Sequence, residues 1–100
     1  MELTGSQKRH LRGLGHKLPV AATLGKAGIS QGVTAKLKDL LGRRELIKVR
    51  LPAGEPKDRQ ELSEQLARAA GAEVAGAVGR MVLLYKPSDT LAPEKRIKLP

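Results

Sequence analysis

Segments with helical spacing alternate with short apolar segments along this chain, and this alternation is what most restricts its fold. Apolar residues recur every three or four positions in three stretches, at about 4–18, 31–42 and 57–70. Between and after these stretches lie runs typical of strands, "VAATL", "ELIKVRL" and "EVAGAVGRMVLLYKP". The last run is divided by Gly79 and Arg80, which predicts a hairpin of two strands. The predicted order is helix–strand–helix–strand–helix–strand–strand.

This order predicts a two-layer α/β domain, αβαβαββ, with a four-stranded mixed sheet. Strands joined by a helix are expected to be parallel neighbours, and the final hairpin supplies an antiparallel pair. One hundred residues with no Phe, no Trp and a single tyrosine, Tyr85, fit one domain with an aliphatic core. We place that domain at residues 1–87 and a basic tail at residues 88–100. The tail is either loose or pinned by Ile97 and Leu99.

The first predicted helix is apolar on one side and cationic on the other. Thr4 and Gln7 have the spacing of a capping box at its start. Its inward stripe is predicted to be Leu11, Leu14 and Leu18. Its outer side carries Arg9, Arg12 and His16, with Lys8 on the flank.

The second helix is expected to begin after Ser30 and to end at Gly42. The strand "ELIKVRL" is expected to turn Ile47, Val49 and Leu51 inward and Lys48 and Arg50 outward.

Charge is the strongest signal in the composition. The formal net charge is +9, and the first fifty residues hold eleven basic and three acidic side chains. Such an excess favours a polyanionic partner, above all nucleic acid. No apolar run is long enough to span a bilayer, the first residues have no secretory pattern, and there is no cysteine. We therefore predict a cytoplasmic protein, a monomer with no membrane partner.

The stretch "GKAG", Gly25 to Gly28, lies between the first predicted strand and the second predicted helix. Glycines at such a junction allow a tight turn and allow a ligand to approach the backbone. The helix that follows starts with unpaired N–H groups and a partial positive charge, which suit a phosphate, and Lys26 adds a full charge. A GXXG loop of this kind clamps single-stranded RNA in KH modules. An ordinary turn is the alternative interpretation.

Three segments with consistent spacing resemble a known family. They are "LTGSQKRHLRGLGHKLPVAATLGKAGISQGV", "RELIKVRL" and "GAVGRMVLLYKP". The chain is similar from about Leu3 to Pro87 to the CRM-domain family, the chloroplast RNA splicing and ribosome maturation domains, and specifically to its free-standing bacterial YhbY-like members. The resemblance implies a fold akin to the C-terminal domain of translation initiation factor three. It also implies a GxxG loop that contacts RNA, in bacteria within precursors of the large ribosomal subunit and in plants during group II intron splicing.

Carried onto this chain, the resemblance makes the loop and nearby cations the RNA-binding residues. The loop residues are Gly25, Lys26, Ala27 and Gly28, and the cations are Lys8, Arg9 and Arg12. From the charge pattern we add Lys17 as a flanking cation, with Lys36, Arg80 and Lys86 as further candidates. Two positions depart from the family pattern. Lys86 stands where arginine is common, which weakens bidentate phosphate recognition, and Ala27 replaces a frequent polar residue.

Other functions have less support in the residues. His10 and His16 are six positions apart, so they cannot form a metal pair on one helix face, and no cofactor is expected. "GKAG" lacks the spacing of a P-loop and no catalytic grouping is suggested, so we predict no enzyme. Tyr85 is more easily explained as closing a strand than as stacking on a base. The remaining alternative is a protein-interaction module that docks on a ribosomal protein or another acidic partner.

Overall fold

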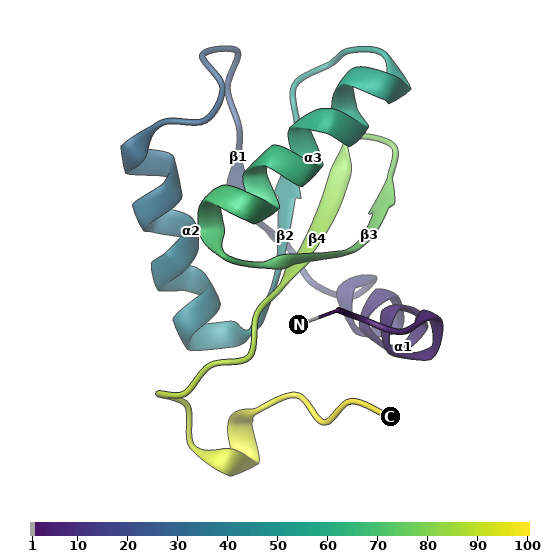
Figure 1. Ribbon diagram of the computed structural model, residues 1–100, viewed down its shortest axis with the longest axis vertical. Helices are drawn as coiled ribbons and strands as arrows, with labels where there is room; N and C mark the ends of the chain where they lie inside the picture. The colour runs from purple at the N-terminus through teal and green to yellow at the C-terminus, as the bar shows by residue number, and fades with distance from the viewer. Residues whose placement is uncertain (1) are drawn as a thin grey trace.

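Four strands form one mixed sheet in the order β1-β2-β4-β3 in the computed structural model, which describes residues 2–100 (Figure 1). The strands are β1 (Val20–Thr23), β2 (Leu46–Arg50), β3 (Glu73–Val78) and β4 (Met81–Tyr85). β1 is parallel to β2, and β4 is antiparallel to both β2 and β3. The predicted class, element order and four-stranded mixed sheet are confirmed.

The expectation that strands joined by helices are neighbours holds for β1 and β2 but is wrong for β2 and β3. The hairpin folds β4 back between them. β4 takes this central place because four of its five residues, "VLLY", are buried. Val82 and Leu84 belong to one apolar cluster, whereas Leu83 and Tyr85 belong to the other. A strand that is apolar on both faces is most stable with helices or other apolar groups on both.

Helices cover the two faces of the sheet unequally. α2 (Gln31–Arg44) and α3 (Pro56–Ala70) lie over one face, where Leu37, Leu41 and Leu66 pack with Ile47 and Val49. α1 (Gly5–Gly15) lies across the other face, where Leu11 packs with residues of β2 and β4. The predicted two layers describe the sheet with α2 and α3, and the structure adds α1 on the opposite face.

α1 begins with the predicted capping box and then departs from the predicted apolar stripe. Thr4 and Gln7 exchange hydrogen bonds between side chain and backbone in both directions. Leu11 is fully buried, but Leu14 is 41% exposed, which corrects its assignment to the core. The inward position belongs instead to Gly15, where an added Cβ would lie 2.5 Å from Leu83 Cδ1. The helix approaches the sheet so closely at its end that glycine is needed there.

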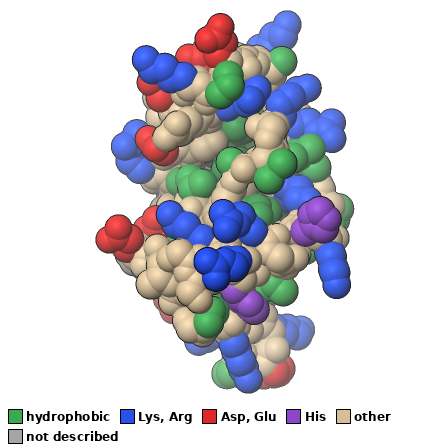
Figure 2. Space-filling model, turned by 90° about the vertical axis from the view of Figure 1, so that its right-hand side faces the viewer, with side chains coloured by type: hydrophobic (Ala, Val, Ile, Leu, Met, Phe, Trp, Pro, Cys, Tyr) green, Lys and Arg blue, Asp and Glu red, His purple; other side chains and the backbone are tan. Residues whose placement is uncertain are grey.

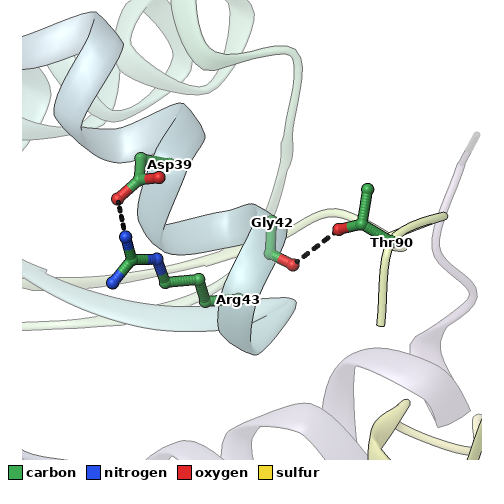
Figure 3. A network of polar contacts seen from close by, with 4 residues as sticks. All are labelled: Asp39, Gly42, Arg43 and Thr90. Atoms are coloured by element: carbon green, nitrogen blue, oxygen red, sulfur yellow. Dashed lines mark hydrogen bonds and ion pairs between the residues drawn. The ribbon is translucent and has the colours of Figure 1, made fainter. Parts of the chain in front are cut away.

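The second helix does not end at Gly42, as its sequence predicts, but continues to Arg44. Asp39 and Arg43 form an ion pair one turn apart, 3.3 Å from Oδ2 to Nη2 (Figure 3). The C-cap is Glu45, the one non-glycine residue with positive φ, 61°, among residues 2–100. Side chains from the tail replace the cap that Gly42 was expected to supply. Thr90 Oγ1 donates to the Gly42 carbonyl (Figure 3), and Ser88 Oγ donates to the same carbonyl.

The tail is pinned, the second of the two arrangements that its sequence allowed. The Glu45 carboxylate, 1% exposed, accepts the backbone N–H of Ser88 on one oxygen and that of Ile97 on the other, at 2.5 and 2.6 Å. A short 3₁₀ helix (Pro93–Lys95) lies between these two points. Ile97 and Leu99 then pack against the apolar cluster beneath α1. Residues 88–100 thus complete the core on that face.

Candidate nucleic-acid interface

The GKAG loop forms a tight turn at one end of the sheet, between β1 and α2 (Figure 1). The Gly28 N–H donates to the Gly25 carbonyl at 3.0 Å, which closes the turn. Lys26 and Ala27 at its tip are exposed. Ile29 anchors the loop by packing on the core, and Ser30 caps α2 by accepting the Val33 N–H at 3.2 Å. Leu24, which is buried just before the loop, anchors its other end, so the tip is held outward between Leu24 and Ile29.

The two glycines of the loop have different reasons to be glycine. Gly28 has a φ of 81°, a conformation that other residues adopt only with strain. Gly25 has no positive φ, and a Cβ built on it would meet nothing within 4 Å. Gly28 is thus required by the turn. Nothing in the folding of the chain requires Gly25, and its bare backbone faces open space.

We expect this difference to appear in stability. Gly28→Ala should lower the free energy of unfolding by about 1–2 kcal/mol, because alanine is strained at that φ. Gly25→Ala should change it by less than about 0.5 kcal/mol, because the position is open and unstrained. Urea unfolding followed by circular dichroism measures both. Equal losses in the two variants would show that both glycines serve the turn alone.

Two of the predicted cations lie at the same end of the sheet as the loop. Lys36 on α2 lines a small cavity together with Thr23 and Leu24, the residues just before the loop. Arg80 lies in the β3–β4 turn, which is at this end because Met81 pairs with Arg50, and Arg50 with Thr23. Its guanidinium is partly occupied within the fold, since Nε donates to the Leu51 carbonyl at 2.9 Å.

The structure does not place the other predicted cations around the loop. α1, the helix that carries Lys8 and Arg9, lies toward the opposite end of the sheet from the GKAG turn (Figure 1). Lys8 borders two hollows along α3, one with Glu64 and Arg68 and one that extends to Gly79. Lys17 is exposed in the connection from α1 to β1. Lys86 follows β4 at the far end, with its ammonium group beside Gly71 at the end of α3.

Lys48 and Arg50 are the cations that sequence reasoning left out of the site. They alternate with buried residues along β2, so they share the face on which α1 lies. α1 covers only part of that face, and Arg50 beyond it is exposed. Arg12 and His16, near the end of α1, border a hollow with Lys48. The signal was present in the strand pattern, which turned both side chains away from the main core.

Cationic side chains gather on the side of the molecule that shows α1 and the β3 edge. Figure 2 shows Lys and Arg side chains across the middle and right of this side, with histidines among them. The Asp and Glu side chains there lie mostly toward the upper and left edges. Among residues 2–100 there is no cluster of three or more His, Cys, Asp or Glu that could hold a metal ion. The surface is suited to holding an anion by its cationic side chains.

Tyr85 lies inside the fold rather than on this surface. It is 3% exposed and packs in the cluster beneath α1. Burial, and after it the charge of Glu45, raises the pKa of the phenol above its ordinary value of 10.0. The side chain closes the end of β4, as its sequence position suggested, and it is not available for stacking on a base.

No helix in the part of the chain that the structure describes is long and apolar enough to cross a membrane.

Comparisons with known proteins agree with this fold. A family model described as the CRS1/YhbY (CRM) domain matches residues 3–86. A Haemophilus influenzae protein named "RNA-binding protein" is 33% identical over 98 residues, covering 98% of this chain and 95% of that protein. "Probable RNA-binding protein YqeI" of Bacillus subtilis is 33% identical over 98 residues, covering 98% and 99%.

A solved structure also matches along nearly the whole chain. It is the solution structure of a hypothetical protein from Staphylococcus aureus, described as a proposed RNA-binding protein. The two share 35% identity and a TM-score of 0.82, with 99% of this chain and 100% of the other covered. The names of these three relatives describe RNA binding and no catalytic activity, in agreement with the prediction that the chain is not an enzyme.

Proposed function

The chain belongs to the CRS1/YhbY (CRM) domain family, as its motifs predicted, and from this we propose that it is an RNA-binding protein. The observation that carries the proposal is the GKAG turn, whose first glycine is left bare without a structural need. Because Gly25 has no side chain, an RNA phosphate could approach its backbone closely. The names of the relatives support the same ligand class.

The proposed contact at the loop is electrostatic. Beyond the Ser30 cap, the first turn of α2 presents backbone N–H groups that favour a phosphate oxygen. Lys26 supplies a full charge at the exposed tip, and Lys36 lines the cavity beside Thr23 and Leu24, which lead into the loop. Tyr85 is buried, so the protein has no exposed Phe, Tyr or Trp ring on which a base could stack. Contacts between cations and phosphates are therefore the main source of affinity that we propose.

The RNA we propose is ribosomal RNA in precursors of the large ribosomal subunit, with the protein acting in assembly as a monomer. This assignment comes from the resemblance to bacterial YhbY-like proteins. The basic face supports a polyanionic ligand but not this particular RNA, because a net charge of +9 suits any structured polyanion. Arg50 and Lys48 extend the proposed surface from the loop toward the end of α1.

Salt dependence tests the proposed contacts. The RNA-binding surface that we propose runs from the GKAG loop along β2 to the end of α1. It contains six cations: Lys26, Lys36, Arg80, Arg50, Lys48 and Arg12. If all six contact phosphates of a single strand, the plot of log affinity against log salt should have a slope of about −4. Lys48→Ala with Arg50→Ala should make that slope shallower by about 1.4.

The matched control removes two exposed cations of the tail, Lys95→Ala with Lys98→Ala. Fluorescence anisotropy with a labelled fragment of large-subunit ribosomal RNA, titrated at several salt concentrations, gives the slopes. The control pair should leave the slope as in the unaltered protein. Equal slopes for all three proteins would remove β2 from the interface, and no binding at any salt concentration would refute RNA binding itself.

A further inference from the structure

An apolar hollow with a cationic rim opens between the end of α1 and the β3–β4 hairpin, on the sheet face that α1 only partly covers. Its volume is about 350 Å³, within the range of about 300–1,000 Å³ that is usual for small-molecule sites. The residues that matter for its chemistry are Val78, Met81, Leu83, Arg12, His16 and Lys48.

The floor of the hollow is apolar although it faces solvent. Val78 is 77% exposed, and it pairs with Met81 across the hairpin on the same face. Leu83 lies deeper, against Gly15 of α1. Among residues 2–100, Val78 is one of two large apolar side chains that are exposed. It is not isolated, because Met81 and Leu83 line the same hollow. An exposed apolar patch with a polar rim is typical of an interaction site.

The rim is positively charged. Arg12 lays its aliphatic stem along Gly76, where an added Cβ would lie 2.6 Å from Arg12 Cγ, and it remains exposed overall. Lys48 and His16 complete the ionisable lining. An apolar occupant alone would gain nothing from these three groups. A ligand with a flat apolar part and an attached anion would satisfy both the floor and the rim.

We propose that this hollow receives one unstacked base of a single-stranded RNA whose backbone continues to the GKAG loop. A nucleotide has the required chemistry, because its base has an apolar face and its phosphate is anionic. Thioether sulfur, guanidinium and imidazole groups all pack favourably on such faces. The bases of a duplex are stacked inward and cannot enter. The inference rests on the proposed function and names the form of RNA that this surface selects.

The position of the hollow agrees with a continuous path. Val78, Met81, Arg50 and Thr23 form one row across the four strands, and the loop begins two residues after Thr23. Adjacent strands lie about 4.8 Å apart, so this row spans about 14 Å from β3 to β1. Arg50 lies between the two ends, where a phosphate of the connecting backbone would pass.

The test compares two oligomers of equal charge, a ten-nucleotide oligouridylate and a ten-unit ribose-phosphate oligomer without bases. Binding is measured by fluorescence anisotropy at one salt concentration. The protein should bind the oligouridylate about tenfold more tightly, which corresponds to about 1.4 kcal/mol. Val78→Ser with Met81→Ser should reduce this ratio to less than about twofold and leave the affinity for the base-free oligomer unchanged.

Two further variants keep the result interpretable. Val78→Ser alone alters an exposed side chain that folding does not need, and it should lower the ratio about threefold. Leu14→Ser removes the other exposed apolar side chain, which is not part of the hollow, and should leave the ratio intact. A ratio near one in the unaltered protein, with both oligomers bound, would overturn this inference and leave RNA binding standing.

The other outcomes are equally decisive. If the ratio is tenfold in every variant, the bases are recognised elsewhere, and the hollow is left for an apolar side chain of a protein partner. If neither oligomer binds but the fragment of large-subunit ribosomal RNA does, this inference is wrong and the proposed function stands. If the fragment does not bind either, both are wrong.

Discussion

Replacing Glu45 by alanine is expected to lower the free energy of unfolding by about 3–5 kcal/mol. The carboxylate is buried and accepts the backbone N–H groups of Ser88 and Ile97. Hydrogen bonds to a charged acceptor contribute about 1.5–3 kcal/mol each, and removing the acceptor leaves both donors without a partner inside the protein. Such a loss is a large fraction of the 5–15 kcal/mol that is typical of a domain.

Urea unfolding followed by circular dichroism measures this loss, with Glu94→Ala, an exposed carboxylate of the tail, as the control. Absorbance titration of Tyr85 gives a second reading, because the chain has no tryptophan and no other tyrosine. In folded Glu45→Ala the pKa of Tyr85 should fall toward its ordinary value of 10.0, while burial keeps it above that value. A stability change below about 1 kcal/mol would show that the tail does not depend on Glu45.

Replacing Lys26 and Ala27 together by aspartate is expected to weaken RNA binding about 100-fold. The change removes the cation at the tip of the GKAG loop and sets two negative charges where the phosphate is proposed to lie. Both side chains are exposed, so the free energy of unfolding should change by less than about 0.5 kcal/mol. The measurement is fluorescence anisotropy with a labelled fragment of large-subunit ribosomal RNA.

The matched control is Lys57→Asp with Ala53→Asp, which makes the same change in net charge at two exposed positions near the start of α3. It should weaken binding less than about tenfold, through the general loss of positive charge. Similar losses in the two double variants would mean that the loop contributes only charge. Unchanged binding in the loop variant would remove the loop from the interface.

Much of the fold could be predicted because local patterns agree with the final structure. The capping box at Thr4, the alternation of Ile47 and Val49 with Lys48, and the turn at Gly79 each depend on residues close in sequence. The tertiary choices were harder. Leu14 fits the helical period of its neighbours, yet Gly15 takes the inward place because α1 passes close to Leu83. Helical spacing cannot reveal which side of a helix comes nearest to a sheet.

Long-range contacts account for the remaining errors. Gly42 is a reasonable helix end when only its neighbours are considered. In the structure the hydroxyl groups of Ser88 and Thr90, almost fifty residues later, donate to its carbonyl, and the helix continues past it. In the sequence Glu45 is only the first residue of "ELIKVRL", and only the folded chain brings Ser88 and Ile97 to it. No local pattern signals a buried carboxylate that binds a distant tail.

For the candidate site, the GKAG turn lies between β1 and α2 as its sequence predicted, but α1, which carries the predicted cations Lys8, Arg9 and Arg12, does not lie beside it. The first fifty residues are strongly basic, and α1 was therefore expected to lie beside GKAG. In the structure β1 carries the chain from the α1 end of the sheet to the loop end, which separates them (Figure 1). Arg50 reaches the loop end because it pairs with Thr23. Strand register, which the sequence did not supply, decides which charges meet.

The most direct test of this account is to identify the cellular RNA that crosslinks to the protein, with the Lys26→Asp/Ala27→Asp variant and its Lys57→Asp/Ala53→Asp control at equal abundance. We expect enrichment of large-subunit ribosomal RNA for the unaltered protein and the control, and its loss in the loop variant. Crosslinks to proteins without RNA, or the same RNA recovered from all three forms, would contradict it. GKAG would then be an ordinary turn, and a protein-docking module would explain the basic surface.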